Sequence, residues 1–379
     1  MRIKNARVYN SYKKSFIRAD LIVEGGKVEE ILYTGSSRGE AENTVVPGFV
    51  DIHSHGAAGF DMMSSTSDEL VEMSRFYAKN GVTTLFLTTA SAPHGQIMKM
   101  IEETKKAKGK AKINFAGIHL EGPYINKNRA GAHPKELIKA PNLDELGEII
   151  GATLGCGLGL HITLAPELEG AMEFMAAAAE KGATLSLGHT EASPEVIKEA
   201  EKLGAKSFTH LFNAMSPIHH RDPGVAGCAL AGDMYAELIC DGIHLRPEVV
   251  RLTQKAKGCG KIIVVSDSMA AAGLPEGEYR LGAARGVHVE NGRAFLKNAD
   301  GSETIAGSTA NLHGELLNFM KFTGRGLEEA LLTVTKNPAE CVGIYDKKGS
   351  IETGKDADFV VMDKNGKIKE VYVNGELVS

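Results

Sequence analysis

Residues 46–56 read VPGFVDIHSHG, and this stretch decides which fold the rest of the chain is expected to adopt. Its apolar run from Phe49 to Ile52, introduced by a proline and a glycine, is typical of a buried strand. His53 and His55 follow at a spacing of two, so both imidazoles lie on one side of the strand. Imidazole binds zinc, iron or manganese-type ions well, so the pair indicates a metal site at the carboxyl end of the strand. A His-x-His pair is weak evidence alone, because two unrelated histidines often have this spacing.

Apolar segments that suit strands alternate with helical segments over the middle of the chain, which predicts a parallel sheet. With the strand that precedes His53, the count reaches eight, the number in a (β/α)8 TIM-type barrel. The other seven expected strands are 83–88, 113–119, 158–164, 183–187, 207–210, 236–240 and 262–266. Helices are expected at 68–79, 171–181 and 194–203, the last with Ser193 as its N-cap. After the eighth strand, the sequence predicts a polar, hairpin-like segment over 277–303 and a return to helix over 312–337.

Both ends of the chain contain short alternating segments with turn signals between them. Gly25-Gly26 near the start and Asn374-Gly375 near the end are expected hairpin turns. We therefore expect both ends to contribute strands to one small β-domain. The expected division is 1–45 and 344–379 for the two parts of this domain, and 46–343 for the barrel.

Composition excludes several classes of protein. The chain has 379 residues, 43% hydrophobic and 24% charged, with a formal net charge of −5, which is typical of a globular protein rather than a disordered or membrane one. There is no run of Lys or Arg, and so no electrostatic reason to expect nucleic acid or an anionic membrane as a partner. No stretch resembles a signal peptide or a spanning helix, so we expect a cytoplasmic protein. The five cysteines lack C-x-x-C spacing, which favours reduced thiols over a cysteine metal cluster.

Polar residues recur where the expected strands end. In a barrel of this kind, functional side chains lie at the carboxyl ends of the strands. Each residue alone has an ordinary explanation, such as a turn or a helix cap, but their recurrence at one rim favours a shared site. These strand-end residues are Glu121, His189, His210, Asn213, Asp241, His244 and Asp267.

A metal centre is the chemistry that these residue types suit best. Glu121, His189 and His210 match a known three-ligand zinc set, one carboxylate and two histidines, which leaves one position for water. His53 and His55 would add a second cation if Glu121 bridges the two. The sequence therefore predicts a metal site of one or two ions.

Asp267 is the expected proton carrier of this centre. A bound metal lowers the pKa of its water towards neutrality, which provides hydroxide at cellular pH. One carboxylate can then act as general base towards the attacking water and as general acid towards a leaving amine. There is no G-x-x-x-x-G-K-[ST] loop, so a phosphate group on the substrate would be held by isolated cations.

The chain resembles the amidohydrolase superfamily in motifs that span most of its length. These are the first-strand His-x-His, GVTT at 81–84, TKNPA at 335–339 and GKDAD at 354–358. Within the superfamily, the chain is most similar to the deacetylases of amino-sugar phosphates. That similarity is carried, in order, by HLEGP at 119–123, GAHP at 131–134, LGHT at 187–190, HLFNAM at 210–215, DGIH at 241–244 and SD at 266–267.

The resemblance implies a barrel with a small β-sandwich domain made from both chain ends, acting as a homodimer. It implies hydrolysis of the acetamide of N-acetyl-D-glucosamine 6-phosphate to D-glucosamine 6-phosphate and acetate. It also implies a divalent metal, zinc, iron or a similar ion. Family members that do not have both first-strand histidines use one metal, so the presence of His53 and His55 together favours two per subunit.

Site residues can be carried over from the same resemblance. Glu121, His189 and His210 correspond to metal ligands and Asp267 to the catalytic acid and base, while His133 would touch the acyl carbonyl and stabilise the oxyanion. The implied substrate contacts are Ala132, Asn213, Ala214, Arg221, His244, Ala306 and Gly307. Of these, the arginine would reach the phosphate in a neighbouring subunit.

Other functions remain open at this point. The same scaffold supports dihydroorotases, hydantoinases and other hydrolases of cyclic amides. Those enzymes use a bridging lysine, whereas the fourth strand here ends in TLAPE at 163–167 without one, and Glu121 takes the bridging place. A non-enzymatic relative would be expected to have lost ligands, and none is missing. The galactosamine epimer of the substrate and the identity of the metal stay undecided.

Overall fold

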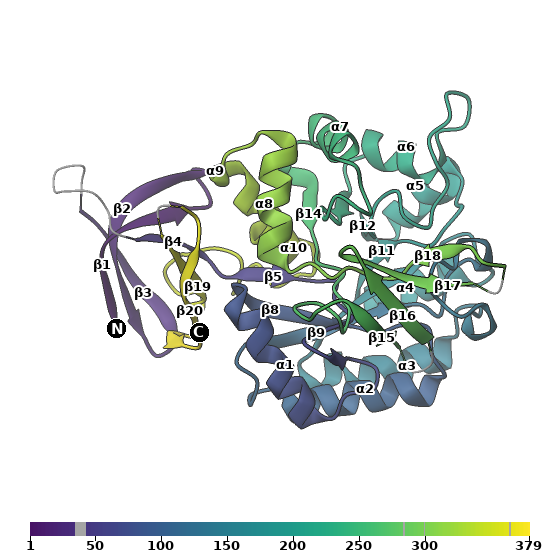
Figure 1. Cartoon of the computed structure of the whole chain (residues 1–379), viewed down its shortest axis with the longest axis horizontal. Helices are drawn as coiled ribbons and strands as arrows, with labels where there is room; N and C mark the ends of the chain where they lie inside the picture. Colours follow the sequence, from purple (N-terminus) through teal and green to yellow (C-terminus); the bar gives the residue numbers. More distant parts are fainter. Residues whose placement is uncertain (35–42, 283–284, 299, 364) are drawn as a thin grey trace.

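The structure is a computed structural model that describes residues 1–34, 43–282, 285–298, 300–363 and 365–379. Its largest element is a barrel sheet of eight parallel strands, which are neighbours in the order of the sequence (Figure 1). These strands are β5 (Phe49–Asp51), β8 (Val82–Thr88), β9 (Asn114–Glu121), β10 (Gly159–Leu164), β11 (Thr184–Leu187), β12 (Ala205–Phe208), β13 (Tyr235–Leu238) and β14 (Ile262–Val264). The predicted fold class, a TIM-type barrel with separate β-structure from both chain ends, is confirmed.

The first and last strands meet just beyond their regular pairing. The backbone N–H of Asp267 donates to the carbonyl of His53 at 2.9 Å, and that of His55 donates to the carbonyl of Ser268 at 2.7 Å. Ser54 and Ser268 also form an isolated parallel bridge. These contacts bring residues more than two hundred positions apart in the sequence side by side at the same rim.

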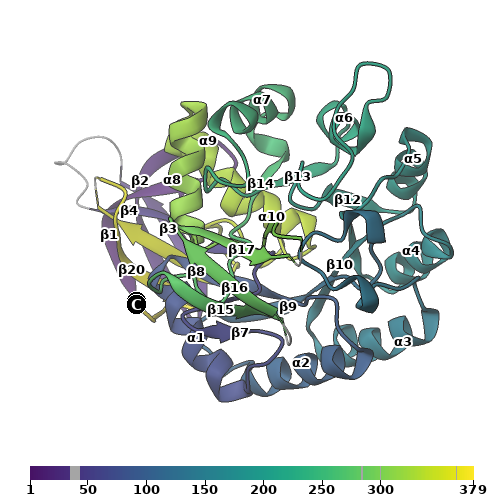
Figure 2. The same ribbon diagram turned by 45° about the vertical axis from the view of Figure 1, so that its right-hand side comes forward.

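Helices pack around the outside of the barrel (Figures 1 and 2). They are α1 (Ser67–Lys79), α2 (His94–Ala107), α3 (Leu143–Ala152), α4 (Ala171–Glu180), α5 (Pro194–Lys202), α6 (Gly224–Ala231), α7 (Pro247–Lys257) and α8 (Leu312–Thr323). The three helices predicted from the sequence end within one residue of their expected bounds. Ser193 caps α5 as expected, because its side-chain oxygen accepts from the backbone N–H of Val196.

The helix predicted over 312–337 is interrupted. Gly324 ends α8 with a φ of 72°, in the left-handed region that glycine adopts without strain. Three short helical pieces follow, α9 (Leu327–Ala330), η5 (Leu331–Val334) and α10 (Lys336–Cys341). The segment is helical as predicted, but Gly324 separates α8 from the shorter pieces that follow.

The two chain ends build a separate seven-stranded sheet (Figure 1). Its strands, in spatial order, are β21 (Glu376–Leu377), β20 (Ile368–Val373), β19 (Phe359–Met362), β4 (Thr44–Pro47), β1 (Arg2–Asn10), β2 (Ser15–Glu24) and β3 (Lys27–Tyr33). The predicted turn at Gly25-Gly26 joins β2 to β3, with both glycines at positive φ. The sheet has its own apolar core, to which both ends contribute, for example Leu21, Val45 and Phe359.

The polar segment predicted after the eighth strand is a four-stranded antiparallel sheet. It consists of β15 (Gly277–Leu281), β16 (Arg285–Glu290), β17 (Arg293–Lys297) and β18 (Glu303–Ile305). Positions 283–284 and 299 of the predicted segment lie outside the described residues. This sheet matters for the site because Leu281, Gly282 and residues 303–305 form part of a pocket wall.

Two predictions from composition can be compared with the structure. All five cysteines are free thiols, as the lack of paired spacing indicated. None of the helices in the described part of the chain is long and apolar enough to cross a membrane.

Candidate active site

The site is built from residues at the carboxyl ends of the barrel strands. Glu121 is the last residue of β9, whereas His189, His210 and Asp267 each follow a strand by two or three residues. Those three have backbone φ angles of 50°, 31° and 42°, in the left-handed region that residues other than glycine rarely adopt. Such backbone strain clusters at functional sites, where the surrounding structure holds it in place. The same backbone conformation turns each chain segment sharply at the rim.

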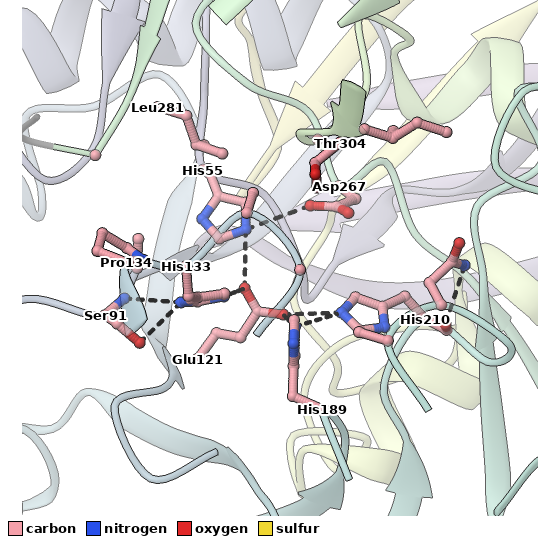
Figure 3. A pocket seen from close by; sticks show the side chains of 18 of the residues that line it. His55, Ser91, Glu121, His133, Pro134, His189, His210, Asp267, Leu281 and Thr304 are labelled. Carbon is pink, nitrogen blue, oxygen red and sulfur yellow. Dashed lines mark hydrogen bonds and ion pairs between the residues drawn. The ribbon is translucent and has the colours of Figure 1, made fainter. Parts of the chain in front are cut away.

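The carboxylate of Glu121 is the centre of the cluster, and five imidazoles surround it. Figure 3 shows His133 on one side of it, His55 above, and His189 and His210 on the other side. The nitrogens nearest to its first oxygen are Nε2 of His210 at 3.1 Å, of His189 at 3.3 Å and of His53 at 3.4 Å. The nitrogens nearest to its second oxygen are Nε2 of His55 at 3.2 Å and of His133 at 3.4 Å.

Hydrogen bonds on the far side of two rings fix where their lone pairs point. Nδ1 of His189 lies 2.7 Å from the carbonyl of Arg129, so it carries the proton and leaves the Nε2 lone pair facing Glu121. Nδ1 of His53 lies 3.1 Å from a carboxylate oxygen of Glu237, which has the same effect, and Nε2 of His53 has no hydrogen-bond partner among the described residues. With neutral rings, these lone pairs face carboxylate oxygens without a proton between them.

A divalent cation fits this arrangement of acceptors. Four ligands at 2.0–2.1 Å around a tetrahedral ion lie about 3.3 Å from one another, which is close to the separations around Glu121. Two sets of buried ligand atoms meet this requirement, His53, His55 and Glu121, and Glu121, His189 and His210. Because they share one carboxylate, the two sets indicate a binuclear metal site.

Electrostatics in the cluster favour positive charge. Burial alone would lower the pKa of His53 and of His55, but the carboxylates of Glu121 and Asp267 outweigh it. The pKa of His53 is therefore raised well above its ordinary value, and that of His55 is raised to about 9. A buried site that attracts protons so strongly is also suited to bind cations.

Asp267 lies beside this cluster with its carboxylate in the charged form. Its Oδ1 is 3.3 Å from Nε2 of His55 and 3.5 Å from Nε2 of His53. Burial raises the pKa of Asp267, but the two imidazoles lower it further, so the net shift is downward. The side chain also lines the pocket, so an ionised oxygen is available there to accept a proton.

His133 is held as a neutral hydrogen-bond donor. The backbone N–H of Ser91 donates to its Nδ1 at 3.0 Å, which places the ring proton on Nε2. Burial lowers the pKa of His133 to about 4, against the opposing effect of Glu121, so the ring is uncharged at neutral pH. Its Nε2–H faces the second oxygen of Glu121 at 3.4 Å, and the residue lines the pocket.

A cavity of about 440 Å³ opens over the cluster. Its floor is formed by Glu121, His189, His210 and Asp267, and its walls include Leu281 from β15 together with β18. The volume is in the range of small-molecule sites.

Comparison with known proteins identifies the family of the chain. The amidohydrolase family pattern matches residues 44–378. N-acetylglucosamine-6-phosphate deacetylase from Bacillus subtilis is 37% identical over 351 residues, covering 91% of this chain and 87% of that protein. The human protein of the same name is 32% identical over 397 residues, covering 100% and 95%. The chain belongs to the amidohydrolase family, among the N-acetylglucosamine-6-phosphate deacetylases.

Solved structures of such deacetylases have the same fold. The deacetylase from Thermotoga maritima superposes with a TM-score of 0.91 at 33% identity, covering 100% of this chain and 99% of that one. A mutant of the Mycobacterium smegmatis deacetylase, in complex with N-acetyl-D-glucosamine-6-phosphate, superposes with a TM-score of 0.89 at 30% identity, covering 100% and 99%.

The substrate contacts predicted from the sequence are only partly gathered at the pocket. Five of the seven line it, namely Ala132, Asn213, Ala214, His244 and Gly307. Ala306 is fully buried in the apolar core behind β16 and β17. Arg221 is exposed, and its guanidinium contacts the ring of His220 at 2.7 Å outside the pocket wall.

Two further residues that contact the cluster, Ser91 and Glu237, could not be identified from a motif. Ser91 was not singled out because no motif marks a serine that orients a histidine 42 positions away. Glu237 was included in an expected apolar strand at 236–240. A signal was present there, since one charged residue inside an apolar strand has to find a partner in the core.

Proposed function

We propose that the chain hydrolyses the acetamide of N-acetyl-D-glucosamine 6-phosphate to D-glucosamine 6-phosphate and acetate in a metal-dependent reaction. The observation that carries this proposal is the buried Glu121 carboxylate shared by two ligand sets at the floor of a pocket that also contains Asp267. The full-length similarity to deacetylases of this name supports the choice of substrate.

Two divalent cations, zinc, iron or similar ions, would be held by these residues. Glu121, His189 and His210 would hold one, and His53, His55 and Glu121 the other. Such ions lower the pKa of water and polarise a carbonyl oxygen. Charge supports the number two, since the buried carboxylates of Glu121, Asp267 and Glu237 carry more negative charge than one divalent ion balances.

Asp267 would move the proton in this reaction. In the first step, its carboxylate accepts a proton from the water that attacks the acyl carbon. When the C–N bond breaks, the same proton passes to the leaving nitrogen, which departs as the free amine of the sugar. The lowered pKa of Asp267 keeps it ionised and ready for the first step.

His133 would stabilise the negative charge that forms on the acyl oxygen. Its ring is neutral with the proton on Nε2, because Ser91 donates to Nδ1. This N–H would donate to the acyl oxygen in place of Glu121, whose second oxygen lies 3.4 Å away. A donor fixed in place before the reaction stabilises a developing oxyanion without reorganising during the reaction.

The phosphate group would be bound partly by a second copy of the chain. The described residues that line the pocket include histidines but neither Lys nor Arg, although a phosphate dianion calls for a strong cation. Arg221 lies in the loop before α6, which projects beyond the surrounding helices in Figures 1 and 2. We propose that the chain forms a homodimer in which this arginine reaches the partner's pocket and acts there with His244.

Removing the arginine should affect the phosphorylated substrate selectively. For Arg221→Ala, kcat/KM for the 6-phosphate is expected to fall by the equivalent of about 2–5 kcal/mol, the usual cost of truncating one member of a buried charge pair. Hydrolysis of unphosphorylated N-acetylglucosamine should barely change. Arg75→Ala is a suitable control, because Arg75 is an exposed arginine paired with Glu72 on α1. Equal losses on both substrates would contradict the assignment.

Mixed dimers test whether the arginine acts across the interface. An Arg221→Ala chain and an Asp267→Asn chain should each be nearly inactive alone. Co-assembled, they should regain activity, because one of the two sites then combines an intact Asp267 with the partner's intact Arg221. Mixed dimers that form without this recovery would show that the arginine serves its own subunit or no site.

The first-strand histidines should control the number of bound metals. Replacing His53 and His55 together with Asn is expected to lower the metal content from about two to about one per chain, since the set of Glu121, His189 and His210 survives. Elemental analysis of the purified variant measures this directly. The matched control replaces the exposed neighbours His219 and His220. If wild type and the His53/His55 variant bind the same number of ions, the two-metal proposal is wrong.

Release of acetate from two epimeric substrates tests the proposed function itself. We expect the purified, metal-loaded protein to release acetate from N-acetylglucosamine 6-phosphate faster than from the galactosamine epimer. The reverse preference would assign the chain to the alternative substrate. Hydrolysis of neither, together with hydrolysis of a cyclic amide, would overturn the proposal.

We also propose that residues 1–45 and 344–379 form one structural unit and residues 46–343 the other. The core of the terminal sheet supports this division, because its buried members come from the two end segments alone.

A further inference from the structure

Glu237 is a buried carboxylate at the base of the candidate metal site. It lies on β13, between Ala236 and Leu238, and its side chain is fully shielded from solvent. One oxygen is 3.1 Å from Nδ1 of His53 and 3.3 Å from the backbone N–H of His210. The residue therefore touches two candidate ligands from behind without lining the pocket.

Only one of the two oxygens of Glu237 has hydrogen-bond donors among the described residues. In the described part of the chain its second oxygen has no hydrogen-bond partner, and Nε2 of His161 lies 3.8 Å from it. An ionised carboxylate removed from water is costly unless its partners compensate for the lost hydration. A role towards the group bound above it would explain why the carboxylate is present.

We propose that Glu237 is a positioning residue for His53. By accepting the proton of Nδ1, it fixes the ring tautomer and directs the Nε2 lone pair towards the cation that His55 and Glu121 also bind. Its negative charge makes the imidazole a stronger donor to that cation. This inference rests on the proposed two-metal function.

The contact distinguishes one of the two ligand sets from the other. Nδ1 of His189 is held by a neutral backbone carbonyl, and Nδ1 of His210 has no hydrogen-bond partner among the described residues. Glu237 touches His210 through its backbone N–H, so the negative charge of Glu237 acts on the ring of His53 rather than on a ring of the other set. Loss of the carboxylate should therefore weaken the cation bound by His53 and His55 and spare the cation bound by His189 and His210.

Metal retention in a Glu237→Gln variant tests this selectivity. Wild type and variant are loaded with Zn²⁺ and dialysed against a series of chelator concentrations, and the metal content per chain is measured. The more weakly held ion of the variant is expected to bind roughly 10- to 100-fold less tightly than in wild type, the usual effect of losing such a partner. The other ion should be retained as in wild type. Glu315→Gln is the matched control, because Glu315 is equally buried but touches no candidate ligand.

A double variant separates positioning from a general effect on the barrel. In a His53→Asn background, which already lacks the second ion, adding Glu237→Gln should not change the metal content or affinity further. A Glu237→Gln variant that keeps both ions with wild-type affinity overturns the inference, and so does one that loses both ions equally.

Imidazole ¹⁵N spectra of the metal-loaded wild type give a test that does not depend on folding of a variant. The signal of His53, assigned by its loss in His53→Asn, should show a protonated, hydrogen-bonded Nδ1, and an unprotonated Nδ1 overturns the inference. Failure of the proposed function is distinguishable, because wild type would then release no acetate. A wild type that releases acetate with one bound ion leaves the deacetylase function in place and overturns the role of Glu237.

Discussion

Replacing Asp267 with asparagine is expected to reduce turnover by roughly a hundredfold to ten-thousandfold, the range for a lost general acid and base. The amide keeps the shape of the side chain but cannot accept a proton from water. Metal content should change little, because Asp267 belongs to neither of the two ligand sets. The measurements are kcat for acetate release and the number of metal ions per chain.

A second pocket carboxylate provides the control for this prediction. Glu303 lines the same cavity but is paired with Arg293 at 2.5 Å and lies outside both ligand sets. Glu303→Gln should therefore have a much smaller effect on kcat. An Asp267→Asn variant with near-normal turnover and normal metal content would refute the role of Asp267 as proton carrier.

Replacing Glu121 with glutamine should have an effect at least as large and should remove metal as well. Glu121 is shared by both ligand sets, and both of its oxygens face imidazole nitrogens at 3.1–3.4 Å. An amide offers one oxygen and one NH2 group, so it cannot bridge two cations in this way. We expect the metal content to fall from about two per chain to less than one, and acetate release to fall to background.

The control for this variant has to show that the barrel still folds. Glu315→Gln makes the same change at a buried carboxyl outside both sets, and it should keep both ions. Circular dichroism of the two variants checks that each retains its secondary structure. A Glu121→Gln protein that keeps two ions and wild-type turnover would show that the carboxylate does not bridge them.

The candidate metal ligands could be selected from the sequence because their signal is local. Each candidate ligand stands at or just after an apolar strand, and parallel strands in a barrel bring their carboxyl ends to one rim. Strand positions and residue types were thus enough to gather Glu121, His189 and His210, and the structure places these three side chains around one point.

Other features could not be predicted because they depend on contacts between distant segments. The pairing of Glu237 with His53 joins positions 184 apart, and the sequence does not contain the distance between them. The orientation of His133 depends on a backbone N–H at Ser91, which every residue type except proline would provide. The expected role of Arg221 involves a second chain, so one sequence could suggest it only through family resemblance.

Acetate release during metal reconstitution is the most direct test of the central claim, that a shared-carboxylate metal centre hydrolyses N-acetylglucosamine 6-phosphate. The protein is stripped with a chelator, metal is added back in known equivalents, and acetate is measured at each step. We predict no acetate above background from the stripped protein, and a rate that rises to a plateau at about two ions per chain. A wild-type rate from the stripped protein, or no acetate at any metal load, would contradict the account.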